Sequence, residues 1–577
     1  VSGNTITITG ATAANVGGIN FMSLASAPGS TNQFTLAGAS GGTLNFATNA
    51  IVQAQETTST GSNFITFASS LALTGNGLTF QKFTGSGTTT QFIRVDSTSN
   101  PGLTGTLTIK GNDGGIFLRS AAATTFGAMS GVVVEANSAF SATGGGSYTL
   151  PISVAGFGGA SQYGAIRVDT NSTTFTQPIT LTADAGIQTN TGGVTGTVLA
   201  GGVTGAFGFT RFATGSGTGT LAITGVSNYT GTTTLGRLGT FAGGVTILDF
   251  ANSSTATDLI YNGVTANNVS FIGGNNSATV LRLNGKADTV NSQSLGNISV
   301  GGAATTIGGL AVLELISSGT GQMNASIGTI TRDARGMIAF IAPASGTIST
   351  TQADGVLGPW ATFRNAAGVT SWAQVVAGKV EGGFTGNLAY STGTAISAVG
   401  GYSAASHLTL SQASKGAVSV TGTTTDIATV SMTDTLIDRS VTLGGNTLRL
   451  GATPTGGGVQ LAANAKNLTI SGGTLTAGGA TNTAGQLFLT NQSNTAVLQV
   501  DANITNNGTG AIMLLVNGVA GSRTVLTGTN TFTGSGTIAS GTVEMRSAGA
   551  LGSSGTVSVL EGAALLVSGG FNISRTF

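Results

Sequence analysis

The stretch ITGVSNYTGTTTL (223–235) recurs, in an alignment without gaps, as LTGTNTFTGSGTI (526–538). Both copies read apolar-Thr-Gly, then an aromatic residue with Thr-Gly, then Thr and an apolar residue. In a second pair, FIRVDSTSN (92–100) is followed by AIRVDTNST (165–173), which starts 73 residues later. If three coils separate this second pair, each coil holds about 24 residues, within the usual repeat range of about 20–50. Repeats of this length predict one strand-and-turn unit stacked many times along the chain.

Short runs of apolar residues alternating with Thr or Ser fill the rest of the sequence. Examples are TITITG (5–10), TLTIKG (106–111) and NLTISGG (467–473). A period of two is typical of a strand with one buried face. The runs end on turn-forming residues, as in GNDGG (111–115) and TNNGTG (505–510). No helical stripe longer than two turns interrupts these runs, and the sequence therefore predicts an all-β protein.

The composition excludes several other classes of protein. Glycine supplies 95 of the 577 residues, yet hydrophobic residues make up 40% and the mean hydropathy is +0.31, so the chain can bury the apolar surface that disordered chains lack. The 20 basic and 19 acidic residues nearly cancel, which argues against a nucleic-acid-binding protein with a concentrated basic face. The chain has no cysteine and one histidine, His407, so we predict no zinc site and no cofactor.

Among all-β architectures, the repeats favour a solenoid over a propeller or a set of sandwiches. A propeller would show blades of about 40–50 residues with a fixed dipeptide, and none is found. Repeats that drift in length are typical of a β-helix, in which loops vary while strands stack about 4.8 Å apart. We expect Val, Ile, Leu and Phe to point inward and Thr, Ser and Asn outward. The sequence predicts a single elongated rod of about 20–29 coils.

Four blocks of the sequence carry a resemblance to a known family. LAITGVSNYTGTTTL (221–235) and VLTGTNTFTGSGTIASGTVEMRSAGALG (525–552) resemble the autotransporter-associated β-strand repeat of bacterial surface proteins. GTITRDARGMIAFIAPASG (328–346) and GVLGPWATFRNAAGVTSWAQVVAG (355–378) resemble a segment between such repeats in large secreted proteins of planctomycetes and verrucomicrobia. The resemblance implies a right-handed parallel β-helix, secretion, a place on the cell surface and no enzyme activity.

The resemblance divides the chain into two parts. Residues 215–577 carry the family-like blocks, whereas residues 1–214 are expected to form an N-terminal solenoid part with weak repeats. No run of about 18 residues is continuously apolar, so we predict no transmembrane segment. The first strand and the last coil have no polar cap, and the closing phrase FNISRTF (571–577) stops in mid-pattern. We therefore expect either a longer chain or end-to-end self-association through the unpaired strand edges.

The best candidate for an acid/base patch is the pair Asp96 and Asp169, with Arg94 and Arg167 beside them. Glycosidases need two carboxyl groups about 5–9.5 Å apart. The favoured alternative is structural, with each aspartate capping a turn through its side chain and each arginine on the outer face. We assign no catalytic residue.

The densest acidic stretch contains Asp426, Asp434, Asp438 and Arg439. We favour a surface cluster at a loop or coil boundary, and the alternatives are a calcium site or a carboxylate pair. His407 is expected at a loop or strand edge. No metal site is predicted from either group.

Trp360 and Trp372 are the two tryptophans of the chain and belong to one irregular segment near residues 355–378. In one hypothesis the rings lie at the surface and bind a glycan by stacking on a sugar. In the favoured one they are buried where a loop that opens at Gly358-Pro359 packs on the coils, because Trp anchors loops through its large buried area.

Taken together, these patterns predict a non-enzymatic extracellular structural protein, a cell-surface stalk or filament subunit whose main partner is itself. The alternative is an adhesin that binds surface glycans or neighbouring cells. A β-helix enzyme that degrades polysaccharides is a distant third.

Overall fold

Nearly all regular structure in the chain is β-structure. The computed structural model describes residues 4–8, 14–23, 33–39, 42–56, 64–82, 91–112, 115–159, 163–190, 195–214, 219–237, 241–261, 265–272, 278–301, 309–333, 335–383, 387–389, 402–412, 418–451, 456–560, 562–573 and 575–577. In these ranges every element is a strand except one 3-10 turn, η1 (Phe250–Asn252). Most strands pair in parallel with a strand of the next coil. The predicted all-β class is confirmed.

Contacts divide the chain into two compact units. The first contains Val1–Arg237, Phe241–Ser270 and Leu281–Asn297, and the second contains Leu238–Thr240, Phe271–Val280 and Ile298–Phe577. The boundary expected after residue 214 falls inside the first unit.

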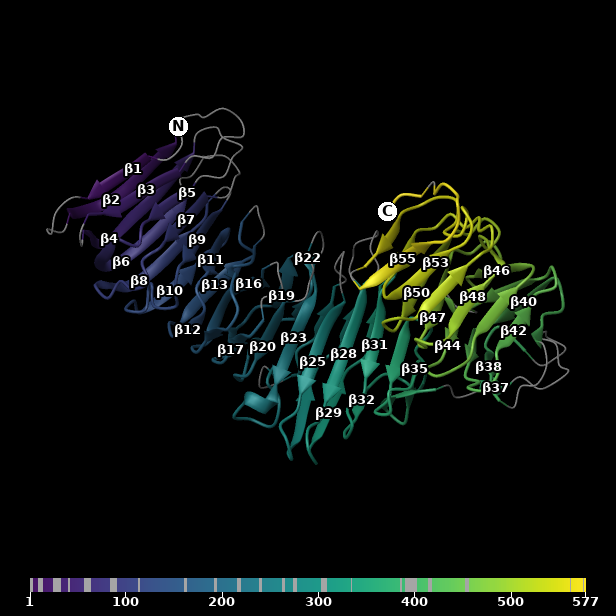
Figure 1. Cartoon of the computed structure of the whole chain (residues 1–577). Helices are drawn as coiled ribbons and strands as arrows, with labels where there is room; N and C mark the ends of the chain where they lie inside the picture. Colours follow the sequence, from purple (N-terminus) through teal and green to yellow (C-terminus); the bar gives the residue numbers. More distant parts are fainter. Residues whose placement is uncertain are drawn as a thin grey trace. The chain divides into compact units, whose positions relative to one another are not determined.

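Parallel ladders build the first unit, and successive strands of a ladder come from successive coils (Figure 1). One ladder comprises β1 (Asn4–Ile8), β3 (Gln33–Gly38), β5 (Phe64–Phe67), β7 (Gln91–Val95), β9 (Ile116–Ser120), β11 (Ser138–Ala142), β14 (Ile166–Val168), the second half of β16 (Ile179–Thr189), β19 (Phe209–Thr214) and β21 (Thr233–Leu235). A second comprises β2 (Ala14–Ser23), β4 (Thr43–Glu56), β6 (Ala72–Lys82), β8 (Leu103–Lys110), β10 (Gly131–Val134), β13 (Ile152–Gly156), the first half of β16 and β18 (Val203–Gly205). A third comprises β12 (Gly146–Tyr148), β15 (Thr173–Phe175), β17 (Thr197–Leu199), β20 (Thr220–Ile223) and β23 (Gly244–Asp249). The remaining strands up to the second unit are β22 (Phe241–Ala242), which is antiparallel to β19, β24 (Val269–Phe271), β25 (Thr279–Asn284) and β26 (Val290–Ser294).

The strand register tests the repeat length inferred from the IRVD motifs. Arg94 pairs with Arg119, Arg119 with Ser141, and Ser141 with Arg167. The two motifs therefore occupy the same ladder position, three coils apart. The predicted spacing of three coils is confirmed.

Inward positions of the first ladder carry the expected apolar residues, but its outward positions differ from expectation. Ile93 and Leu118 are fully buried in the coil interior. On the opposite face, Phe92 lies 5.0 Å from Phe64 and 5.3 Å from Phe117, measured between ring centroids. An outward row of phenylalanines replaces the predicted Thr, Ser and Asn here, because neighbouring rings bury one another and form a separate apolar cluster.

The first part of the second unit begins with parallel pairs and ends in an antiparallel sheet. The parallel strands are β27 (Ile298–Val300), β28 (Leu310–Ile316), β29 (Gln322–Ile327), β30 (Ile330–Arg332), β31 (Met337–Ile341), β32 (Ile348–Thr350) and β34 (Ala361–Arg364). The antiparallel partners are β33 (Gly355–Val356), β35 (Thr370–Val376) and β36 (Lys379–Gly382). The expected irregular segment near residues 355–378 is thus a small antiparallel sheet, which the uniformly parallel prediction did not include.

The second part of the second unit is again a parallel stack, with three sheets (Figure 1). The first sheet comprises β37 (Asn387–Ala389), β38 (His407–Leu410), β41 (Thr429–Met432), β44 (Gly457–Leu461), β47 (Gly485–Asn491), β50 (Ile512–Gly518), β52 (Gly536–Ile538) and β54 (Val557–Val559). The second comprises β39 (Val418–Ser419), β42 (Arg439–Thr442), β45 (Leu468–Ser471), β48 (Val497–Val500), β51 (Arg523–Leu526), β53 (Gly541–Met545) and β55 (Ala563–Val567). The third comprises β40 (Thr424–Ile427), β43 (Thr447–Leu450), β46 (Thr474–Ala477) and β49 (Asn503–Ile504). Their inward side chains form one apolar core, in which Val441, Ile470 and Val500 are ladder neighbours.

The repeated sequence at 223–235 and 526–538 makes the same hydrogen bonds to the preceding coil in both units. Ser227 Oγ accepts a hydrogen bond from the backbone N–H of Val203 at 3.0 Å, in the preceding coil. Asn530 Oδ1 accepts one from the N–H of Ile504 at 2.6 Å in the same way. The residue after each of them donates its own N–H back to the carbonyl of Val203 or Ile504. The repeat therefore joins consecutive coils at a turn through a polar side chain.

Candidate functional site

Both tryptophans lie in the small antiparallel sheet, and both are buried. Trp372, in β35, pairs with Thr362 of β34 and is 0% exposed, while Trp360, just before β34, is 6% exposed. A ring that stacks on a sugar needs an open face. The glycan-binding role considered for Trp360 and Trp372 is therefore corrected, because their rings are covered by the protein itself.

Trp372 packs against the coils that follow it in the second unit. A side-chain carbon added at Gly458, in β44, would lie 2.6 Å from Cβ of Pro359 and 3.0 Å from Cζ2 of Trp372. Real carbons do not approach so closely, so the absence of a side chain at Gly458 allows the sheet to dock here. The loop opening at Gly358-Pro359 thus packs on a coil, as in the structural hypothesis.

Arg332 completes this contact with a charged side chain between two rings. Its guanidinium lies 5.7 Å from the ring centre of Trp360 and 5.3 Å from that of Phe488 in β47. Its Nε donates to the carbonyl of Gly336 at 2.7 Å, and one of its terminal nitrogens donates to Gln486 Oε1. Burial lowers the pKa of Arg332 to about 10, which still leaves it charged at neutral pH. The charge is stabilised by the π-faces and by hydrogen bonds to neutral acceptors.

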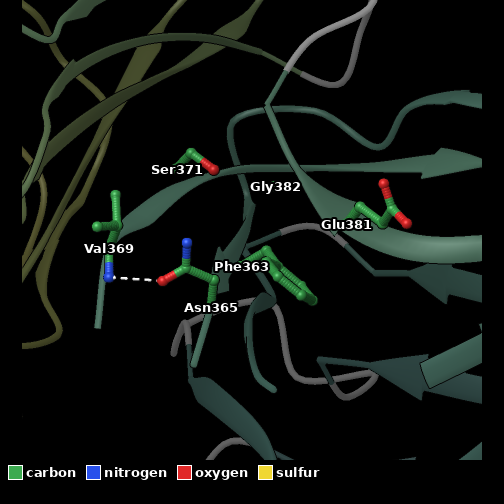
Figure 2. A pocket seen from close by; sticks show the side chains of 6 residues that line it. All are labelled: Phe363, Asn365, Val369, Ser371, Glu381 and Gly382. Carbon is green, nitrogen blue, oxygen red and sulfur yellow. Dashed lines mark hydrogen bonds between the residues drawn. The ribbon is translucent and has the colours of Figure 1, made fainter. Parts of the chain in front are cut away.

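A surface pocket of about 440 Å³ opens on the same antiparallel sheet (Figure 2). Its lining residues are Phe363, Asn365, Val369, Ser371, Glu381 and Gly382. Phe363 and Ser371 are direct partners across β34 and β35. In Figure 2, Val369 and Glu381 lie at opposite ends of the drawn lining. Four of the lining residues belong to the segment near 355–378, and the sequence analysis singled out none of the six.

Two local features keep the pocket open. Gly382 follows Glu381 in β36, and a side-chain carbon on Gly382 would lie 3.1 Å from Cδ1 of Phe363 and closer still to Ser371 Oγ. In the turn between β34 and β35, Asn365 Oδ1 accepts a hydrogen bond from the N–H of Val369 at 2.9 Å. The absence of a side chain at Gly382 leaves the pocket unobstructed. The hydrogen bond within the turn holds Asn365 and Val369, which form another part of the pocket wall.

The candidate acid pair of the first unit does not form. Asp96 is bound to Arg94, and Asp169 is bound to Arg167 at 2.7 Å, so each carboxylate pairs with the arginine two residues before it. The two motifs are three coils apart, which corresponds to about 14 Å at about 4.8 Å per strand. That exceeds the about 5–9.5 Å that glycosidase carboxyl pairs require.

Asp169 serves as a bridge between neighbouring coils. Its Oδ2 accepts from Ser141 Oγ at 2.5 Å, and its Oδ1 accepts from Asn190 as well as from Arg167. The guanidinium of Arg167 also lies 5.4 Å from the ring centre of Phe117. The arginine lies on the outer face as expected, but the described partners of the carboxylate are side chains rather than the turn amides of the capping hypothesis.

The aspartates of the stretch at 426–439 have different partners and different structural roles. Asp434 is fully buried, accepts from Arg439 Nε at 2.9 Å, and also accepts from the N–H groups of Leu436 at 2.8 Å and Ile437 at 3.2 Å. Burial alone would raise the pKa of Asp434, but these hydrogen bonds together lower it. Asp438 instead accepts from the backbone and side chain of Asn467 at 3.0 Å.

The remaining candidates of this group are also held by neighbours. Asp426 pairs with Arg449 of the next coil at 2.5 Å. His407 begins β38, and its Nδ1 lies 2.9 Å from Thr429 Oγ1, with burial lowering its pKa. His407 lies at the start of a strand, as predicted. Within the described ranges, no three His, Asp or Glu side chains gather closely enough to hold a metal ion.

One ion cluster of the second unit was missed by the sequence analysis. Glu544 is almost fully buried on the outward side of β53, where it pairs with Arg523 and with Arg546, the latter at 2.7 Å. Burial tends to raise the pKa of Glu544, but hydrogen bonds from Arg546, Arg523 and Ser568 lower it overall. Arg546 follows β53 and is two residues from Glu544, whereas Arg523 belongs to β51 and is brought close by the strand register.

Comparisons with family models, curated proteins and solved structures found no match to this chain. The resemblance to autotransporter-associated repeats stays a prediction. None of the helical turns in the described residues has the length and hydropathy needed to cross a membrane.

Proposed function

We propose that the protein is a non-enzymatic structural protein of the bacterial cell surface, a stalk or filament subunit built as a β-solenoid. The observation that carries the proposal is the use of polar and charged side chains as bridges between coils. Asp169 bridges three neighbouring coils through Ser141 and Asn190, and Asp426 joins β40 to β43. Ser227 and Asn530 do the same at equivalent turns in the two units. Such bridges hold neighbouring coils together, which suits a protein with a structural role.

The finer features of the proposal are a right-handed coil, a single rod and self-association. Parallel β-strands joined by short connections support a solenoid. Leu566 and Val567 of β55 are 45% and 41% exposed, and exposed apolar residues on a strand that pairs with β53 suit contact with a second copy.

Electron microscopy of the purified protein tests the structural proposal. We expect elongated particles at low concentration and fibres at high concentration, with an axial repeat close to the particle length. Compact particles at every concentration would contradict it.

A glycan-degradation assay tests the proposal that the protein is not an enzyme. We expect no release of reducing or unsaturated ends from a panel of polysaccharides. Release of such ends that is abolished when Asp96 and Asp169 are both changed to Asn would instead establish an enzyme.

A further inference from the structure

The pocket on β34, β35 and β36 has features that a scaffold does not need. It combines an apolar ring with a hydroxyl, an amide and a carboxylate within about 440 Å³. Small-molecule sites are usually concave, with a volume of about 300–1,000 Å³ and a few polar groups that orient the ligand. We propose that this pocket binds one pyranose ring of a neutral saccharide.

The lining determines the class of ligand. Val369, which is 41% exposed, and the edge of the largely buried Phe363 ring supply apolar surface for the C–H groups of a sugar, while Ser371 Oγ and the amide of Asn365 supply hydrogen-bonding groups. Glu381 is exposed and is the charged residue of the lining. Its two oxygens accept from adjacent hydroxyl groups, whereas a phosphate or a uronic acid would be repelled. One carboxylate is also too few for a calcium site, which takes 6–8 oxygen ligands.

Gly382 is the residue on which access depends. Its backbone does not lie in the left-handed region, so another residue is tolerated there without backbone strain. An added side chain would meet the hydroxyl of Ser371, which can rotate, and the ring edge of Phe363. Gly382→Ala therefore narrows the pocket between Ser371 and Phe363, and we expect it to leave β35 and β36 paired. This binding role does not depend on whether the chain forms filaments.

Binding is measured by saturation-transfer NMR and calorimetry on the full chain. The probes are the methyl glycosides of glucose, galactose, mannose and N-acetylglucosamine, together with cellohexaose. We expect at least one probe to bind, and Gly382→Ala and Glu381→Ala each to weaken that binding about tenfold or more.

Matched controls separate pocket effects from folding. Gly570→Ala adds a carbon with nothing within 4 Å, and Glu135→Ala removes an exposed carboxylate that lies 3.9 Å from Lys110. Both controls should bind like the original protein, and all four variants should melt at similar temperatures.

Three results would overturn the proposal. One is the absence of binding to every probe at millimolar concentration. Another is equal binding by Gly382→Ala and the original protein. The third is stronger binding of a cationic probe, lysine ethyl ester, than of any neutral glycoside, since that would mark a cation site at Glu381.

Discussion

The parallel coils and the antiparallel sheet at β33–β36 are stabilised by different kinds of contact. In the coils each side chain meets its counterpart from the next coil, so Val441, Ile470 and Val500 share one environment. In the antiparallel sheet, Trp372 packs on Gly458, a residue of a different strand type far along the chain. The coils depend on a repeated local pattern, whereas the sheet depends on unique distant contacts. Substitutions should therefore act differently in the two regions.

The largest effect is expected from a charge in the coil interior. Ile470→Asp places a carboxylate among apolar side chains where no cation is near in the ladder, and we expect a loss of about 4 kcal/mol or more in the free energy of unfolding. Leu489→Asp, at another fully buried position, should do the same. Urea denaturation measures both.

The control for the interior is the outward neighbour Thr469, which is partly exposed. Thr469→Ser should change the stability by less than about 0.5 kcal/mol. If Ile470→Asp and Thr469→Ser shift the midpoint equally, the assignment of inner and outer faces is wrong.

The next effect concerns the buried pair of Asp434 and Arg439. Asp434→Asn leaves the Arg439 charge buried without its partner, and we expect a loss of about 3–5 kcal/mol at neutral pH. Because the folded pKa of Asp434 is lowered, its stabilisation is complete above about pH 4 and is lost as the pH falls through the folded pKa. The difference between the two proteins should therefore shrink in acid. A difference that is constant from pH 7 to pH 2 would argue against this pair.

A smaller effect is expected where the antiparallel sheet docks. Gly458→Ala should cost about 1–3 kcal/mol through overpacking against Pro359 and Trp372. Because Trp360 and Trp372 are the two tryptophans of the chain, displacement of the sheet should shift the fluorescence to longer wavelength. Gly570→Ala is the control, and an unchanged spectrum and stability in Gly458→Ala would contradict the docking contact.

The smallest effect compares the two sequence repeats directly. Tyr229 and Phe532 are equivalent and both fully buried, but Tyr229 carries a hydroxyl that is hydrogen-bonded to Thr233. Tyr229→Phe should cost about 1 kcal/mol, since Thr233 loses its partner. Phe532→Tyr should cost more, because position 536 is glycine and offers no hydroxyl. Equal losses of stability in the two variants would contradict this predicted difference between the repeats.

Alternation and repeat spacing were sufficient to predict the strands and the coil length. The IRVD motifs at Arg94 and Arg167 predicted three intervening coil steps, and the register has that spacing. Some polar partners were harder to predict, because Asp169 also binds side chains of neighbouring coils and Asp426 takes its partner from the next coil. Asp426 and Arg449 meet across 23 residues of sequence, and nothing in the local pattern of either indicates the other.

The sequence by itself determined the all-β class, the coil period and the inward position of residues such as Ile470, because strand alternation is a local property with a period of two. Tertiary structure alone decided where the tryptophans lie, which glycine accommodates them and where the pocket opens. The contact of Arg332 with Gln486 joins residues 154 positions apart, and that of Arg335 with Met513 joins residues 178 apart. A local pattern carries no information about such pairs, because they depend on how distant parts of the second unit pack against each other.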